Sequence, residues 1–293
     1  MVISFAPRSA AVIDYWNLTR PRIVTLVLAA MLASALTATE TVPSWSLLLH
    51  AMLGTTGIIV GAIAMNQRLE HRADAIMPRT AGRPLPSNRL SAGQVTVFSA
   101  VTTIVGTAYL IWFGNAPLVI LAIFGWLCYV AVYTPLKKRS IWQTPIGAVA
   151  GAMPAVLGAA AAGAPWSLMG WTIFGIVFCW QFPHAMAIAW LYRDQFEAAG
   201  IKVATVVDPS GKAAGWFALF GAILLPVVSV LPLCFSLAGW TYAFIASLLA
   251  LIYLACSVMF FKTPNEVSAR RLLRVSLFYL PLLLIALVTM RNI

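Results

Sequence analysis

Acidic side chains are rare in this 293-residue chain, which has eight Asp and Glu residues against nineteen Lys and Arg. Three oxygen-bearing side chains nevertheless recur at a regular spacing, at Asn66, Glu70 and Asp74. Residues four apart on an α-helix are offset by only about 40° around its axis, so these three share one face of a helix that Pro78 is expected to end. Two carboxylates and a carboxamide are oxygen ligands suited to Mg²⁺. Substrate phosphates commonly supply the remaining ligands of a protein-bound Mg²⁺ ion.

A second acidic pair, Asp194 and Glu197, is spaced three residues apart and so also shares a helix face. Two such clusters facing each other would hold a diphosphate between metal ions, while neighbouring Arg and Lys residues neutralise its remaining charge. The alternative is that both clusters are solvated helix ends paired with nearby arginines. The rarity of acidic residues elsewhere favours the metal-binding interpretation.

The elements that carry these residues must lie in a membrane. Hydrophobic residues make up 61% of the chain and charged residues 9%, and the mean hydropathy is +0.91, whereas a soluble domain has roughly a quarter of its residues charged. We therefore predict an all-α polytopic membrane protein, a single integral membrane domain over residues 1–293 with residues 1–19 as a cytoplasmic N-terminal arm. A spanning helix needs about 20 mainly apolar residues, and the sequence predicts nine of them, at about Ile23–Thr39, Trp45–Ala64, Val95–Phe113, Pro117–Tyr133, Pro145–Ala162, Ser167–Ile188, Trp216–Phe235, Trp240–Phe261 and Val275–Met290.

The basic residues indicate how the chain is oriented. All except Arg291 precede the first predicted span or follow the second, fourth, sixth and eighth. The positive-inside rule then places the N-terminus and the long loops in the cytoplasm and an outer C-terminus across the cell inner (cytoplasmic) membrane. Orientation and contact with lipid headgroups thus account for most of the net charge of +11, and a nucleic-acid partner is excluded.

Several stretches are recognisable. The pattern N-x-x-x-E-x-x-x-D followed by RTAGRPLP resembles the first aspartate-rich motif of the UbiA superfamily of intramembrane prenyltransferases. Within it, the chain resembles the protoheme IX farnesyltransferase family, the haem O synthases, through RPRIVTL (20–26), YTPLKKRSIWQTPIGAVAGAMPAVLGA (133–159) and WQFPHAMAIAWLYRDQFEAAGIKV (180–203). The family usually has Asp where this chain has Glu70. The Y-A-x-x-D motif of many quinone prenyltransferases is absent, which leaves Asp194, with Glu197 as a weaker candidate, for a second metal position.

The resemblance implies a UbiA-type helical bundle that transfers the farnesyl group of farnesyl diphosphate to a vinyl group of haem b, giving haem O and diphosphate, with water supplying the hydroxyl group. It implies Mg²⁺ held by Asn66, Glu70, Asp74 and Asp194, which would stabilise the developing diphosphate charge. It also implies that basic residues contact the substrate, namely Arg22, Arg79, Arg83, Lys137, Lys138 and Arg193. For Lys137 and Lys138 the alternative role is to orient the chain in the membrane.

His184 is the expected contact with the porphyrin. It follows Pro183 near the cytoplasmic end of the sixth predicted span. Haem iron commonly takes an imidazole ligand, and an ionisable group at membrane depth indicates function. The alternative is a histidine that is hydrogen-bonded within the bundle.

Two other functions remain open. A UbiA-type enzyme acting on a quinone precursor or a chlorin would share the metal site and differ in its acceptor. A small-molecule transporter would place its polar groups near the bilayer midplane, whereas here the carboxylates gather at one interface. A haem A synthase or an oxidase assembly factor is a candidate partner for the haem-farnesylating function.

Overall fold

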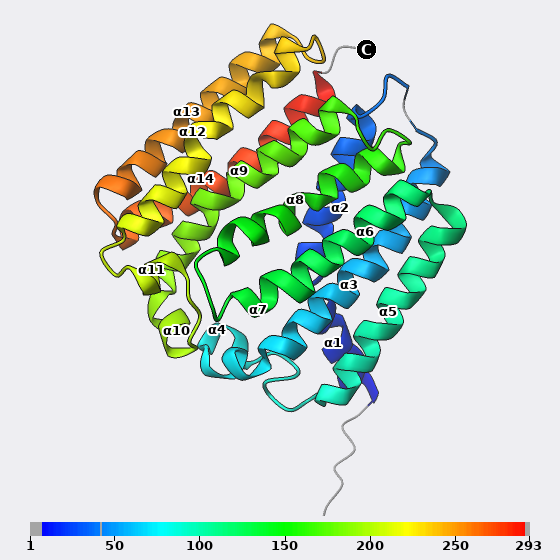
Figure 1. The fold of residues 1–293 in the computed structure, drawn as a ribbon, viewed down its shortest axis with the longest axis vertical. Coiled ribbons are helices and arrows are strands. Elements are labelled where there is room, and N and C mark those ends of the chain that lie inside the picture. The colour runs from blue at the N-terminus through cyan, green and yellow to red at the C-terminus, as the bar shows by residue number, and fades with distance from the viewer. Residues whose placement is uncertain (1–7, 42, 291–293) are drawn as a thin grey trace, which may run out of the picture.

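The computed structural model describes residues 8–41 and 43–290, and these residues form a bundle of helices (Figure 1). The helices are α1 (Arg8–Thr19), α2 (Pro21–Thr37), α3 (Trp45–Ile76), α4 (Pro78–Ala81), α5 (Ala92–Phe113), α6 (Ala116–Leu127), the π-helix η1 (Cys128–Tyr133), α7 (Thr134–Leu136), α8 (Gln143–Ala161), α9 (Leu168–Leu191), α10 (Arg193–Ala198), α11 (Ala204–Val207), α12 (Lys212–Cys234), α13 (Trp240–Lys262) and α14 (Glu266–Thr289).

The number of spans agrees with the prediction of about nine. Within the described residues, eight helices are long and apolar enough to cross a membrane, and a bent pair, Val12–Thr19 with Pro21–Thr37, makes nine if it is counted as one span. The chain is therefore an all-α polytopic membrane protein. Of the expected N-terminal arm, residues 8–19 are helical, while residues 1–7 and Arg291 lie outside the described residues.

The bend between α1 and α2 is centred on Arg20, whose φ of 51° and ψ of 63° are left-handed. Arg20 precedes Pro21, and the proline ring disfavours the right-handed helical conformation in the residue before it. The helix is therefore interrupted at Arg20, and the two axes meet at 42°.

Helix α3 is longer than the membrane requires. Its 32 residues span about 48 Å at 1.5 Å per residue, against a hydrocarbon core of about 30 Å. The side chain of Ser44 caps its first turn, and the helix ends just before Pro78, as the sequence predicts. Asn66 lies about 31 Å from the start of the helix, so the face with Asn66, Glu70 and Asp74 begins near the edge of the hydrocarbon.

The fourth span contains a π-helical turn, which the sequence did not predict. Residues Cys128–Tyr133 form η1 between α6 and α7. The Thr134 hydroxyl donates a hydrogen bond of 2.8 Å to the carbonyl oxygen of Tyr129, five residues earlier. A π-turn changes which side chains face a neighbouring helix, and such turns are frequent at functional sites.

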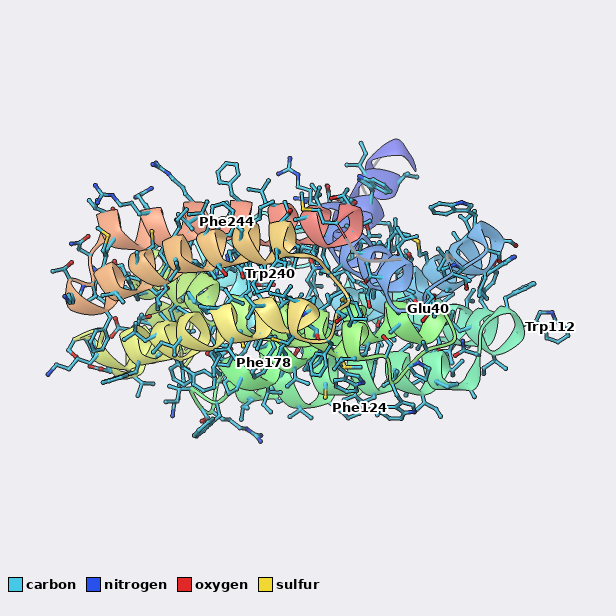
Figure 2. The ribbon with its side chains drawn as sticks, turned by 90° about the horizontal axis from the view of Figure 1, so that it is seen from above. Glu40, Trp112, Phe124, Phe178, Trp240 and Phe244 are labelled. Atoms are coloured by element: carbon cyan, nitrogen blue, oxygen red, sulfur yellow. The ribbon has the colours of Figure 1, made fainter. Side chains whose placement is uncertain are left out.

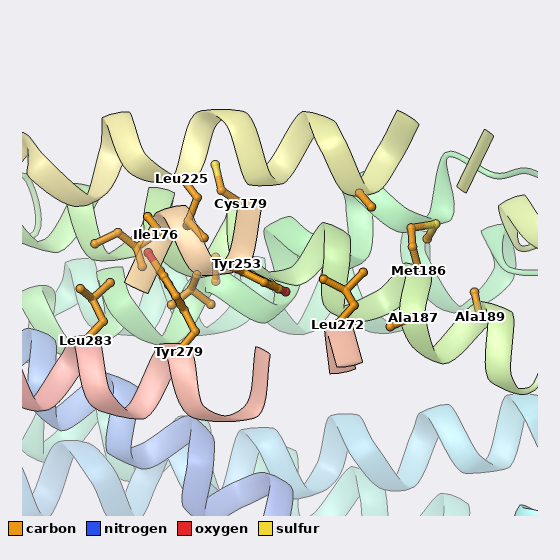
Figure 3. Close-up of a cluster of buried hydrophobic side chains, with 14 of the residues drawn as sticks. Ile176, Cys179, Met186, Ala187, Ala189, Leu225, Tyr253, Leu272, Tyr279 and Leu283 are labelled. Atoms are coloured by element: carbon orange, nitrogen blue, oxygen red, sulfur yellow. The ribbon is translucent and has the colours of Figure 1, made fainter. Parts of the chain in front are cut away.

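The helices pack in two groups. Helix α9 contacts α12 and α14 around a large apolar core that includes Tyr253, Tyr279 and Leu283 (Figure 3), while α3 packs along α5. Helix α8 lies between the two groups and contacts α2, α6 and α9. Large apolar side chains such as Trp112 and Phe244 point away from the bundle (Figure 2), as expected of a surface covered by lipid.

Candidate active site

One cavity of about 1050 Å³ opens between α2, α3, η1, α8 and α9. Near the ends of α3 and α4 its wall carries charged side chains, namely Arg20, Glu70, Asp74, Arg79, Arg83, Arg89 and Lys137. The remaining wall is mainly apolar and includes Ile23, Val27, Ile58, Ile59, Trp126, Met153 and Leu157. The cavity therefore joins a cationic mouth to an apolar interior.

The predicted polar face of α3 lies on the wall of this cavity. Asn66, Glu70 and Asp74 all line it, as their spacing implied. The Asn66 amide nitrogen donates a hydrogen bond of 2.9 Å to the hydroxyl of Thr134, beside the π-turn, so its carboxamide oxygen is left to accept another partner. The π-turn therefore contributes to the orientation of the first residue of the motif.

Each carboxylate of the motif already has a cationic partner. Lys137 Nζ lies 2.8 Å and 3.0 Å from the two carboxylate oxygens of Glu70, and both side chains are largely buried. Arg83 pairs with the fully buried Asp74 carboxylate. Burial alone would lower the pKa of Lys137, but Tyr133, whose ring lies 4.5 Å away, and Glu70 outweigh it and raise that pKa. Lys137 therefore carries its charge at neutral pH.

Two further cations at the mouth have no carboxylate partner among the described residues. The Arg79 guanidinium stacks on the rings of Tyr192, at 4.8 Å, and Phe196, at 4.5 Å. Burial, followed by the nearby charge of Arg83, lowers the pKa of Arg79. Arg20 also lines the mouth without an ion pair. These two guanidinium groups leave the mouth with uncompensated positive charge suited to phosphate oxygens.

Arg20, rather than the expected Arg22, is the arginine of the RPR sequence that lines the cavity. Arg22 is exposed and does not contribute to the wall. The left-handed conformation of Arg20 interrupts the helix and sets its side chain apart from those of α2. The sequence contained a signal for the helix break at Arg20, because a residue before proline is biased away from the helical conformation.

The second predicted cluster does not face the first. The Asp194 side chain is 88% exposed and makes only a 3.4 Å ion pair with the adjacent Arg193, and neither residue lines the cavity. Lys138 and Glu197 are likewise exposed and outside the wall. The helical path breaks at Tyr192, after α9. In the next helix, α10, Phe196 packs against the Arg79 guanidinium. Asp194 stands two residues, or about 200° of helical rotation, from Phe196 and so points the opposite way.

His184 lies on the cavity wall but is also hydrogen-bonded within the bundle. Its Nδ1 is 2.8 Å from the hydroxyl of Ser276, and its ring stacks on Trp180 with a centroid separation of 4.6 Å. Sequence reasoning missed Gln181, which lines the same wall. A glutamine within an apolar span was the available signal, because polar groups at membrane depth are uncommon and indicate function.

The donor chemistry at the mouth fits a divalent metal that phosphates help to bind. Within residues 8–41 and 43–290, no group of three or more His, Cys, Asp and Glu converges to form a metal site. Asn66, Glu70 and Asp74 nevertheless supply oxygen ligands on one cavity wall. Because Mg²⁺ commonly takes one or two carboxylates and completes its shell with water and substrate phosphates, this partial set is suited to Mg²⁺.

Comparison with known proteins agrees with this geometry. Residues 26–282 match the UbiA prenyltransferase family. The chain is 42% identical to the protoheme IX farnesyltransferase of Rhodopirellula baltica, over 92% of this chain and 96% of that protein, and 38% identical to that of Solibacter usitatus, with the same coverage. Its fold is similar to that of a digeranylgeranylglyceryl phosphate synthase, with a TM-score of 0.79 at 17% identity, covering 95% of this chain and 97% of the other.

A second solved structure, a UbiA homologue of Archaeoglobus fulgidus bound to GPP and Mg²⁺, has a TM-score of 0.58 at 12% identity, covering 94% of this chain and 99% of that one. At these identities the solved structures establish the fold, and the family match over most of the sequence establishes the relationship. The chain belongs to the UbiA prenyltransferase family.

Proposed function

We propose that this prenyltransferase transfers the farnesyl group of farnesyl diphosphate to a vinyl group of haem b, giving haem O and diphosphate in a Mg²⁺-dependent reaction. The observation that carries the proposal is the cavity that joins a cationic mouth to an apolar interior, in a chain 42% identical to a protoheme IX farnesyltransferase. Such a cavity suits a substrate with a charged head and a long apolar tail.

The mouth would bind the diphosphate. Arg20 and Arg79 are not engaged by carboxylates within the described residues and would donate hydrogen bonds to its oxygens. Asn66, Glu70 and Asp74 would hold Mg²⁺, which supplies neutralisation of the charge that develops on the leaving group. The hard step is the separation of an allylic cation from an anion, so donors positioned before the reaction lower its barrier.

The interior would hold the apolar parts of both substrates. Its volume, about 1050 Å³, slightly exceeds the roughly 300–1000 Å³ of small-molecule sites, in accord with two reactants bound together. Apolar side chains such as Ile58, Met153 and Leu157 would exclude bulk water from the allylic cation. His184 lies on this wall and is the proposed contact with the porphyrin.

The proposed orientation places the mouth at the cytoplasmic face of the cell inner membrane. The basic connections follow even-numbered spans, and α1 and the C-terminal end of α14 lie at opposite ends of the bundle (Figure 1). The N-terminus would then be cytoplasmic and the C-terminus outside. A haem A synthase or an oxidase assembly factor remains a candidate partner, since the farnesylated product stays in the membrane.

The test is turnover by the purified protein in lipid with haem b, farnesyl diphosphate and Mg²⁺, with the haem products identified by mass. Haem O is the expected product, and its formation should stop without Mg²⁺. A parallel reaction with 4-hydroxybenzoate in place of haem b tests the quinone-precursor alternative. Prenylation of 4-hydroxybenzoate with no farnesylated haem would refute the proposed acceptor.

A further inference from the structure

Two polar side chains on one face of α9 reach the cavity beyond its charged mouth. Gln181 and His184 are three residues apart, so they project from the same side of the helix, and both line the cavity. The Gln181 amide nitrogen donates hydrogen bonds to the carbonyl oxygens of Ala148, at 3.0 Å, and Val177, at 3.1 Å. Because both of its N–H groups are engaged, only the acceptor atom, Oε1, remains.

The hydrogen bonds around His184 likewise leave it with one free acceptor atom. The Ser276 hydroxyl donates to the carbonyl oxygen of Leu273 at 2.6 Å, so it accepts a hydrogen bond from His184 Nδ1 at 2.8 Å. A neutral imidazole protonated on Nδ1 carries a lone pair on Nε2, and this tautomer is assigned from the hydrogen-bond network. The stacked Trp180 ring, whose indole nitrogen donates to the carbonyl oxygen of Ser276, fixes the plane of the imidazole.

Both remaining acceptor atoms are unpaired in the described part of the chain and accessible. Within the described residues, neither Gln181 Oε1 nor His184 Nε2 has a hydrogen-bond partner, and neither belongs to the polar atoms that are sealed off without one. Gln181 Oε1 lies against Gly151, a residue of the cavity wall where a Cβ atom would collide with it. The wall therefore presents two acceptors and no donor from these two side chains.

We propose that Gln181 Oε1 and His184 Nε2 bind the water molecule that ends the reaction. This inference rests on the proposed function. Once the farnesyl carbon has left diphosphate and bonded to the terminal vinyl carbon, the positive charge lies on the vinyl carbon next to the porphyrin ring. A water that donates its two hydrogens to two acceptors turns its lone pair outward, toward such a cation.

The step balances with water alone. The water oxygen gives an electron pair to the cationic carbon and forms the C–O bond of the new alcohol. One of its protons passes to His184 Nε2, acting as a general base, and later to solvent, while Gln181 Oε1 holds the other hydrogen. No atom is oxidised or reduced from outside, and diphosphate is the only other product. His184 would thus contact the acceptor at its reacting side chain, through this water.

The test is the ratio of two products. A cation that finds no positioned water loses a proton from the adjacent carbon and gives an alkene lighter than haem O by one water. Wild-type protein should give the alcohol. We expect Gln181→Leu and His184→Phe to release diphosphate still but to give mainly the alkene. General bases contribute about 10²–10⁴-fold, so His184→Phe should lower the alcohol-to-alkene ratio about a hundredfold or more.

A matched variant separates this role from a general effect of losing a polar side chain. Gln143→Leu makes the same change at a cavity-lining glutamine on α8 and should leave the ratio unchanged. If Gln181→Leu has no turnover, the ratio is read from Gln181→Asn, which should also shift it toward the alkene.

Two results would overturn the inference. One is the alcohol as sole product from Gln181→Leu, or from Gln181→Asn if it is used, and from His184→Phe. The other is a His184→Phe variant that changes the absorption spectrum of bound haem b while leaving the ratio intact, which would make His184 an iron ligand. Absence of any farnesylated haem from wild-type protein would instead refute the proposed function.

Discussion

Arg20 offers a sharp test of how the mouth binds diphosphate, because Arg22, two residues on, serves as its control. Both Arg20 and Arg22 are exposed, but only Arg20 lines the cavity, where it has no carboxylate partner in the described chain. The substitutions Arg20→Gln and Arg22→Gln remove the same charge from the same short segment. Gln has no less conformational freedom than Arg at the left-handed position, so neither change requires a new backbone.

The expected loss of activity follows from the hydrogen bond that Arg20, which has no carboxylate partner among the described residues, would donate to the diphosphate. A hydrogen bond to a charged group contributes about 1.5–3 kcal/mol. Arg20 keeps part of its surface open at the mouth, so we take the lower half of that range, about 1.5–2.25 kcal/mol, which corresponds to roughly a 13- to 45-fold loss in kcat/KM for Arg20→Gln. Arg22→Gln, at an exposed position outside the cavity wall, should change kcat/KM by less than about threefold.

The assay is steady-state formation of farnesylated haem at varied farnesyl diphosphate concentration. If Arg20 stabilises charge that develops on the leaving diphosphate, the loss should appear in kcat as well as in KM. Equal activity of Arg20→Gln and wild type, or an equal loss in Arg22→Gln, would contradict the assignment of Arg20 to the diphosphate.

Three further predictions concern the acidic residues and the metal. Asp74→Asn should lower turnover by about 10²-fold or more, since it removes a buried carboxylate of the mouth. Asp194→Asn should retain wild-type turnover because the Asp194 side chain is 88% exposed. The same haem assay compares the two variants. Glu70→Gln leaves Lys137 largely buried without its ion pair and should destabilise the protein by about 3–5 kcal/mol, measured by thermal unfolding in detergent, while unchanged unfolding would show that the pair contributes little. Removal of divalent ions with a chelator should abolish turnover and added Mg²⁺ should restore it; full activity in the chelator would exclude the metal.

The sequence predicted well the features that depend on one helix alone. Hydropathy located the spans, and the spacing of Asn66, Glu70 and Asp74 was enough to place them on one face, because helical geometry fixes which residues share a side. Pro78 gave the end of α3 for a similar local reason.

Features that depend on how two elements meet were harder to predict. The position of Asp194 rests on the break at Tyr192 and on Phe196 packing against Arg79, and neither follows from spacing. The π-turn before Thr134 changes which residues of the fourth span reach α3, and hydropathy does not detect an added backbone residue. Gln181 became visible as an acceptor only when its donors were traced to carbonyl oxygens on α8 and α9.

The length of α3 has a consequence for how the enzyme would release what it makes. Because the helix continues beyond the hydrocarbon, the residues that would bind the phosphates lie at the water boundary, while the rest of the cavity lies among lipid-embedded helices. The two products of the proposed reaction can then leave in different directions. Diphosphate would enter the aqueous phase, and the farnesylated haem would move laterally into the bilayer. The diphosphate would then not have to cross the hydrocarbon, where moving a charge costs several kcal/mol.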